Sequence, residues 1–157
     1  SRICLNEEVR RLVNLVRKSA PPTVQVHADI PPSPLYIAGA PGVLEEIILN
    51  LLRNALEALG QNGGEVSVSL AERRGMAELR IRDTGPGIPP KLLPRIFDPF
   101  FTTKPTGSGL GLAITRSAVE NLGGEISATS TPGKGTEMCV RLPLARPEHE
   151  TRNRRIV

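Results

Sequence analysis

The chain has 157 residues, a formal net charge of +4 and 39% hydrophobic residues, enough for one domain with its own core. No apolar run reaches the roughly 18 residues of a membrane-spanning helix, and the two cysteines are not spaced as a metal or redox motif. From these two features we expect a soluble, cytoplasmic piece. With no Trp and one Tyr, the basic residues also lack the interleaved aromatic residues of single-strand nucleic-acid binders, so we expect no nucleic-acid partner.

The N-terminal part is predicted to form a helix followed by two short strands. Residues 5–20 place Leu and Val at helical spacing, with Asn6 as the expected N-cap and two prolines ending the helix. Residues 23–30 alternate between apolar and polar side chains, which is typical of a half-buried strand. A second short strand is expected near Tyr36.

A second helix and a hairpin are expected next. Pro41 begins the helix, and a glycine at position 60 ends it. Residues 65–72 and 77–83 alternate and are joined by four residues typical of a hairpin turn. The following segment, 84–109, is rich in Gly, Pro and Thr and is predicted to hold one short helix.

The last predicted elements are a helix over 110–122 and strands over 125–129 and 136–144. Two or three long helices and about six strands, largely in antiparallel hairpins, indicate an α+β sandwich with helices on one sheet face. The domain is expected to occupy residues 1–145, and residues 146–157 to form a disordered tail.

Two asparagines lie one turn apart in the second helix. On a helical wheel, Asn50 and Asn54 flank the apolar face that contains Ile47 and Leu51. Each therefore points along the rim between core and solvent, where an amide oxygen can meet a ligand or a cation. Taken alone, the spacing more often reflects amides bonded to a neighbouring loop.

An acidic residue ends the strand over 77–83. The strand's alternation carries Asp83 to the apolar face, and Gly85 and Gly87 allow a planar ligand to approach it. An ordinary turn that begins at an aspartate is the alternative. Thr136 begins a later strand in register with its apolar residues, so it is also expected to face inward.

Alternate glycines, Gly107, Gly109 and Gly111, run directly into the third helix, with Leu110 among them. Exposed N–H groups at a helix N-terminus form an anion site. The pattern is neither a P-loop nor a dinucleotide fingerprint, because no GK[ST] follows it and no strand directly precedes it.

In chain order, the segments LNLLRNALEA, DTGPGI, FDPFFTTKPTGSGLGLAI and TPGKGT resemble the catalytic ATP-binding domain of sensor histidine kinases. The wording FDPFFTTK is most similar to their nitrogen-regulation and oxygen-sensor branch. The resemblance implies the Bergerat ATP-binding fold, a mixed, mostly antiparallel sheet packed on three helices. It also implies a protein-histidine kinase of a two-component system that uses ATP and Mg²⁺.

The resemblance implies a role for each candidate residue. Asn54 would ligate Mg²⁺, and Asn50 would lie beside the phosphates. Asp83 would accept the adenine amino hydrogen, with Gly87 and Thr136 completing the base pocket. In the lid, the segment between the short helix and the third long helix, Gly107, Gly109 and Gly111 would contact the phosphates. Lys104, also in the lid, is the candidate for contacting the γ-phosphate, although a solvated lysine is equally expected there.

The identity of Asn50 implies slow ATP hydrolysis. The resemblance implies that related ATPases carry a water-activating glutamate at the position of Asn50. The amide of an asparagine cannot accept a proton at neutral pH. Phosphoryl transfer itself needs mainly positioning and charge neutralisation. Glu46, one further turn back, is a candidate that could partly replace the lost base.

Neither histidine, His27 or His149, lies in the helical context of a phosphoacceptor. The chain is therefore expected to be mostly monomeric, with little autophosphorylation, and to act on an upstream histidine-containing dimerisation domain. A response regulator would be reached through the full-length kinase, whose membrane anchor, if it has one, would lie elsewhere. The three phenylalanines, at positions 97, 100 and 101, have two interpretations. The resemblance implies a hydrophobic latch that docks on the dimerisation domain, and the alternative is a small satellite core.

Two other functions fit parts of the pattern. A serine kinase of the anti-sigma type uses a similar fold, but it keeps a glutamate where Asn50 stands and lacks FDPFFTTK. A degenerate module that only scaffolds or senses would not need Asn54, Asp83 and the lid glycines together. A Mg²⁺-dependent ATP titration separates a pure scaffold, which shows no saturable binding, from the kinase.

Overall fold

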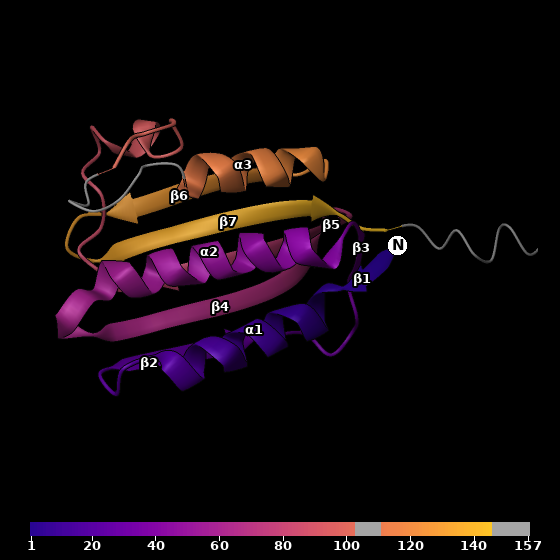
Figure 1. Cartoon of the computed structure of the whole chain (residues 1–157), viewed down its shortest axis with the longest axis horizontal. Helices are drawn as coiled ribbons and strands as arrows, with labels where there is room; N and C mark the ends of the chain where they lie inside the picture. The colour runs from indigo at the N-terminus through magenta and orange to yellow at the C-terminus, as the bar shows by residue number, and fades with distance from the viewer. Residues whose placement is uncertain (103–110, 146–157) are drawn as a thin grey trace, which may run out of the picture.

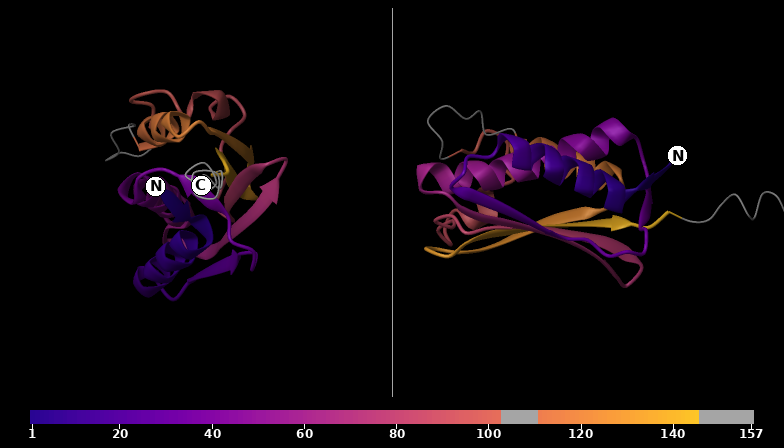
Figure 2. Two further views of the ribbon diagram at one scale, coloured as in Figure 1. Left: turned by 90° about the vertical axis from the view of Figure 1, so that its right-hand side faces the viewer. Right: turned by 90° about the horizontal axis from the view of Figure 1, so that it is seen from below.

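Three helices cover one face of a five-stranded sheet in the computed structural model, which describes residues 1–102 and 111–145 (Figures 1 and 2). The helices are α1 (Leu5–Ser19), α2 (Pro41–Leu59) and α3 (Gly111–Asn121). The strands of the sheet are β2 (Val24–Asp29), β4 (Gly64–Arg73), β5 (Met76–Asp83), β6 (Glu125–Thr131) and β7 (Gly135–Pro143). Their spatial order is β2-β4-β5-β7-β6, with β2 and β4 parallel and the other pairs antiparallel, so the predicted α+β two-layer sandwich is confirmed.

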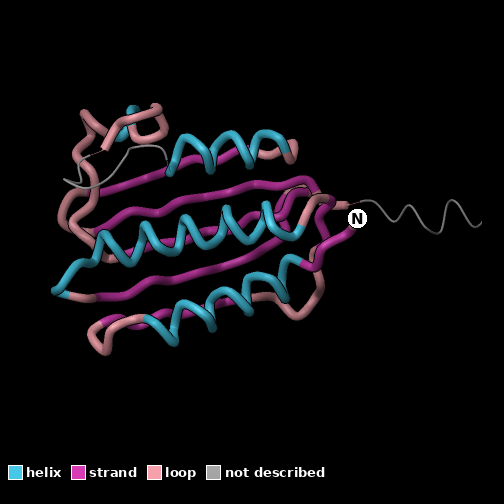
Figure 3. The backbone as a smooth tube through the Cα atoms, viewed as in Figure 1, coloured by secondary structure: helices cyan, strands magenta, loops and turns pink. Residues whose placement is uncertain are grey.

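A second, two-stranded sheet forms at the opposite end of the molecule from the β6–β7 turn (Figure 3). It pairs β1 (Arg2–Cys4) with β3 (Tyr36–Ala38) in antiparallel orientation. The alternation pattern did not predict β1, because three residues are too few to show a period. The N–H of Ala145 donates to the Tyr36 carbonyl at 2.7 Å, so both ends of the described chain meet at β3.

Asn6 does not cap α1, so that prediction is wrong. The helix begins at Leu5, and Asn6 is its second residue, with 2% of its surface exposed. The amide nitrogen donates to the carbonyls of Pro31 and Ser33 at 2.8 and 3.0 Å, and the amide oxygen accepts the N–H of Leu35 at 2.8 Å. These three bonds fasten the proline-rich connection to α1, which a helix cap could not do.

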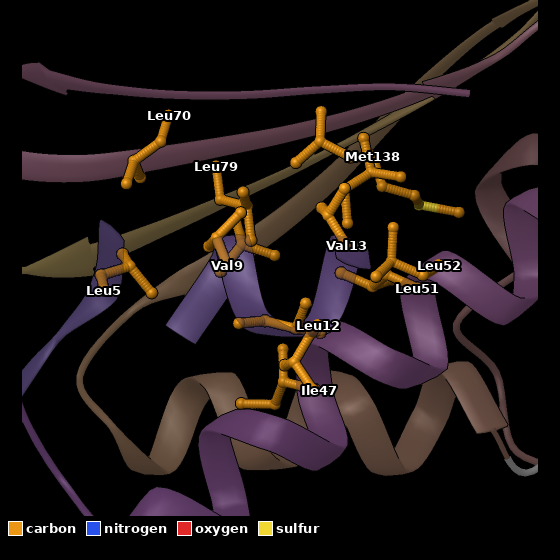
Figure 4. Packing of buried hydrophobic residues seen from close by; sticks show 14 of the residues in the cluster. Leu5, Val9, Leu12, Val13, Ile47, Leu51, Leu52, Leu70, Leu79 and Met138 are labelled. Atoms are coloured by element: carbon orange, nitrogen blue, oxygen red, sulfur yellow. The ribbon is translucent and has the colours of Figure 1, made fainter. Parts of the chain in front are cut away.

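The predicted apolar faces of the first two helices are confirmed, and they pack against inward side chains of the sheet such as Leu79 and Met138 (Figure 4). In α2 the buried arc is wider than predicted, because Ile48 and Leu52 are also buried. The reason is that α2 lies between the other two helices and contacts both. No helix in the described ranges is long and apolar enough to cross a membrane.

Candidate functional site

Four segments that carry predicted site residues meet at one end of the sandwich (Figure 1). Because the strands are antiparallel, β5 ends where β7 begins, and α2 ends at the same side of the molecule where α3 begins. Shorter 3-10 turns lie nearby at Gly60–Asn62 and Leu93–Arg95, the second within the segment predicted to hold a short helix. The predicted lid residues Lys104, Gly107, Gly109 and Leu110 lie outside the described residues, as does the predicted tail.

Asp83 is buried at the end of β5, with 5% of its surface exposed, on the same face as Ile81, as the alternation predicts. Its carboxylate accepts the N–H of Gly85 at 2.9 Å, and Thr136 lies opposite it on β7. Burial raises the pKa of Asp83 above its ordinary value of 3.8, and the backbone N–H groups of Gly85 and Thr136 oppose that rise only in part. No described cation pairs with this carboxylate, so neutral N–H donors of a ligand are its natural partners.

The pH dependence of stability should report this ionisation. A folded-state pKa above 3.8 means that the folded protein keeps a proton that the unfolded chain has already lost, so stability falls as pH rises through the folded pKa. Asp83→Asn, which cannot ionise, should therefore gain free energy of unfolding relative to wild type as pH rises through this window and keep that gain above it. Urea denaturation from about pH 3 to pH 7 checks this. A gain that shrinks as pH rises would contradict the assignment.

The glycines after Asp83 are held against neighbouring backbone. Gly87 has φ +76°, and a Cβ there would lie 2.4 Å from the Thr131 carbonyl oxygen at the β6–β7 turn. A Cβ at Gly85 would lie 2.9 Å from Asp83 Oδ1, and one at Gly135 would lie 1.9 Å from the Asp83 carbonyl oxygen. Gly135 was not among the predicted site residues. These contacts fix the backbone around Asp83, and the contact of Gly85 and Gly87 with a base stays a prediction.

Gly87→Ala is expected to lower stability by more than backbone strain alone. Gly75, in the β4–β5 turn, has the same φ of +76°, but nothing lies within 4 Å of its Cβ position. Alanine at either site costs about 1–3 kcal/mol of strain, and only position 87 adds the collision with Thr131. Chemical denaturation of both variants gives the difference. Equal losses of unfolding free energy would show that the turn is not packed on Gly87.

Thr136 faces inward with 8% of its surface exposed, as predicted. Its hydroxyl lies 2.8 Å from the hydroxyl of Ser130 on β6, a residue that the sequence analysis did not single out. A hollow of about 230 Å³ also opens at the β6–β7 turn, where its lining includes Thr136, Arg82 and Lys134. The hollow therefore shares Thr136 with the predicted site, but neither asparagine of α2 nor Asp83 lines it.

Asn50 joins α2 to the first turn of α3. Its amide nitrogen donates to the Gly111 carbonyl at 3.0 Å and to the Thr115 hydroxyl at 2.7 Å, and that hydroxyl donates to the same carbonyl at 2.9 Å. Because a carbonyl only accepts, the network fixes the amide's orientation and uses both of its hydrogens. The nitrogen thus bonds to a neighbouring segment, which was the alternative interpretation, whereas the oxygen has no hydrogen-bond partner among the described residues. Thr115, 2% exposed, was missed by the sequence analysis.

Asn54 lies one turn further along α2. Its side chain is half-buried and has no hydrogen-bond partner among the described residues. Glu46, one turn before Asn50, is exposed. The two asparagines therefore occupy the rim that the helical wheel predicts, and Asn54 offers a whole amide group to a ligand.

The three phenylalanines, which were predicted to form either a satellite core or a latch for a partner domain, differ in their exposure. Phe97 and Phe101 pack against the core, and the guanidinium groups of Arg116 and Arg95 lie 5.9 and 4.8 Å from their ring centroids, respectively. Phe100 is 73% exposed. Two of the rings therefore pack on the core, the third is exposed, and the latch for a dimerisation domain stays a prediction.

Residues 39–146 match the family model described as "Histidine kinase-, DNA gyrase B-, and HSP90-like ATPase". The sensory histidine kinase/phosphatase NtrB of Escherichia coli O157:H7 is 37% identical over 150 residues, which cover 89% of this chain and 43% of that protein. The chain thus spans less than half the length of this relative.

Solved structures agree with the sequence comparisons. The mycobacterial sensor histidine kinase MprB superimposes with a TM-score of 0.80 at 32% identity, covering 92% of this chain and 97% of that chain. Full-length ShkA in complex with AMPPNP gives a TM-score of 0.81 at 27% identity, covering 92% and 31%. The chain therefore belongs to the family of histidine kinase-, DNA gyrase B- and HSP90-like ATPases, as the ATP-binding catalytic domain of a sensor histidine kinase.

Proposed function

We propose that this chain binds Mg·ATP and donates the γ-phosphate to a histidine on a separate dimerisation domain, as one step of two-component signal transduction. The observation that carries the proposal is the combination of a buried acceptor, Asp83, with the asparagine rim of α2, a helix whose C-terminal end lies at the same side of the molecule as the end of β5 (Figure 1). The match to sensor histidine kinases supports it.

The residues present fit an adenine base. The amino group of adenine is a neutral donor, and Asp83 is a buried carboxylate that only backbone N–H groups reach among the described residues. In this proposal Asp83 accepts the amino hydrogen, while Gly85, Gly87 and Thr136 form the surrounding pocket.

The residues present also fit a magnesium-bound triphosphate. Mg²⁺ prefers oxygen ligands and keeps several waters, so one amide oxygen, that of Asn54, is an adequate protein contribution. Bound Mg·ATP would supply a phosphoryl group whose charge the metal partly neutralises. The oxygen of Asn50 and the N-terminus of α3 at Gly111 would lie beside the phosphates. The remaining lid residues, Gly107, Gly109, Leu110 and Lys104, would complete the contacts.

The chain's own side chains disfavour attack by water. Asn50 cannot accept a proton, and its nitrogen is already bonded to Gly111 and Thr115. Glu46, exposed one turn away, is the remaining candidate base, and we propose no more than a partial role for it. The phosphoryl group would thus be kept for a better nucleophile, such as the neutral imidazole of another domain.

The partner is proposed to be the histidine-containing dimerisation domain of the same kinase, with a response regulator receiving the phosphate afterwards. Exposed Phe100 is the proposed contact on this side. His27, the one histidine in the described ranges, does not suit an acceptor, since it is exposed on a strand and pairs with Glu65 at 2.8 Å.

The proposal is tested by mixing this chain, ATP labelled at the γ-phosphate, Mg²⁺ and a separately prepared dimerisation domain. Label should appear on the histidine of that domain, should require Mg²⁺, and should be nearly absent from the chain alone. Stoichiometric phosphohistidine on the isolated chain, or saturable ATP binding with no transfer to any acceptor domain tried, would contradict the proposal.

A further inference from the structure

Ser130 connects three parts of the base pocket's floor through one hydroxyl group. Ser130 Oγ accepts the N–H of Ile88 at 2.7 Å, contacts the carbonyl of Gly135 at 2.9 Å, and lies 2.8 Å from Thr136 Oγ1. Strand pairing places it directly opposite Thr136, which in turn lies opposite Asp83. These three inward side chains therefore form one row across β6, β7 and β5.

The hydrogens in this row can be assigned by counting. A serine hydroxyl has one hydrogen, and the carbonyl of Gly135 can only accept, so Ser130 donates to Gly135. The Ile88 N–H can only donate, so Ser130 accepts from it. The remaining contact must then be a hydrogen bond donated by Thr136 to Ser130. The hydrogen of Thr136 is thus committed to Ser130, and only its lone pairs remain for a ligand.

We infer that Ser130 is a specificity-determining positioning residue: by accepting the hydroxyl hydrogen of Thr136, it leaves that oxygen only lone pairs to offer beside the Asp83 carboxylate. This inference rests on the proposed nucleotide site. With Ser130 in place, Asp83 and Thr136 both present acceptors. Such a pocket favours a purine with an amino group at position 6 over one with a carbonyl there, because two facing acceptors repel each other.

Ser130→Ala should therefore change base selectivity as well as affinity. Thr136 would lose its acceptor and could rotate to donate toward the ligand, and the Ile88 N–H would lose its partner. Affinity for ATP should fall about tenfold, as expected when a buried donor loses its partner. Affinity for ITP, which carries a carbonyl at position 6, should fall by about threefold or less, since the freed hydroxyl can donate to that carbonyl.

The ratio of the two affinities separates positioning from general damage. ATP and ITP share the same ribose and triphosphate, so loss of structure weakens both by the same factor. Ser127, on the same strand, is exposed on the opposite face, and Ser127→Ala is the matched control that should keep both affinities. Ser130→Thr retains the hydroxyl and should keep the wild-type ratio. Ser130→Cys, with a weakly bonding thiol, should lower it, and it replaces the alanine variant if that fails to fold.

Titrations of ATP and ITP at equal Mg²⁺ against wild type and these variants give the result. We expect the ratio of ATP affinity to ITP affinity to fall in Ser130→Ala and Ser130→Cys and to stay at the wild-type value in the other variants. Saturable ATP binding by wild type with an unchanged ratio in both variants would overturn this inference alone. Absence of saturable ATP binding by wild type would overturn the proposed function itself, and the inference with it.

Discussion

Asp83→Asn is expected to lower the affinity for ATP by about 10- to 150-fold while leaving the protein folded, since a hydrogen bond to a charged group contributes about 1.5–3 kcal/mol. The backbone N–H groups of Gly85 and Thr136 need an acceptor, so they should hold the amide oxygen of the new asparagine. Its NH₂ group would then face the amino group of adenine, and two donors would meet. Calorimetric titration with Mg·ATP measures the loss.

Glu78→Gln is the matched control, because Glu78 is the other buried carboxylate of β5 and lies on the opposite sheet face. Burial opposes its ionisation, but hydrogen bonds from Arg141 and Arg80 outweigh burial and lower its pKa. Both arginines are more than a third exposed, so the variant should lose about 1–2 kcal/mol of stability and keep its ATP affinity. Wild-type ATP affinity in Asp83→Asn would remove Asp83 from the site.

Asn54→Ala is expected to reduce Mg²⁺-dependent phosphoryl transfer by about 100-fold or more, the size of loss that follows removal of one preorganised polar contact. The fold should be preserved. Asn54 has no hydrogen-bond partner among the described residues, and alanine favours a helix more than asparagine does. Transfer to the acceptor domain, measured across a Mg²⁺ titration, should show a loss that excess metal restores only in part.

The control for this variant is Asn14→Ala, the same change on the exposed side of α1. It removes only a surface contact with Arg17, so transfer should equal that of wild type. If Asn54→Ala transferred phosphate at the wild-type rate at every Mg²⁺ concentration, Asn54 could not be the metal ligand.

The side-chain faces of the helices and strands were predictable because they follow from local periodicity. The alternation of β5 predicts that Asp83 faces inward, and the helical wheel of α2 predicts that Asn50 and Asn54 lie on a rim. Both expectations match the burial of these residues. Chain order and turn residues likewise predict the antiparallel hairpins, since Gly and Pro mark the places where the chain reverses.

Contacts between distant segments were not predictable in this way. The bond from Asn50 to Gly111 joins residues 61 positions apart, and no period in either segment encodes it. Ser130 was overlooked because its role depends on strand pairing with Thr136. The prediction that Asn6 caps α1 was wrong for a related reason. Its local context suits a helix cap, but three hydrogen bonds to the proline-rich connection outweigh that local preference.

A crystal structure of this chain with Mg²⁺ and a non-hydrolysable ATP analogue tests the central claim most directly. The account predicts the amino group of adenine on the Asp83 carboxylate and the metal on the side-chain oxygen of Asn54. An analogue bound with its base away from Asp83, or a metal held without Asn54, would contradict it.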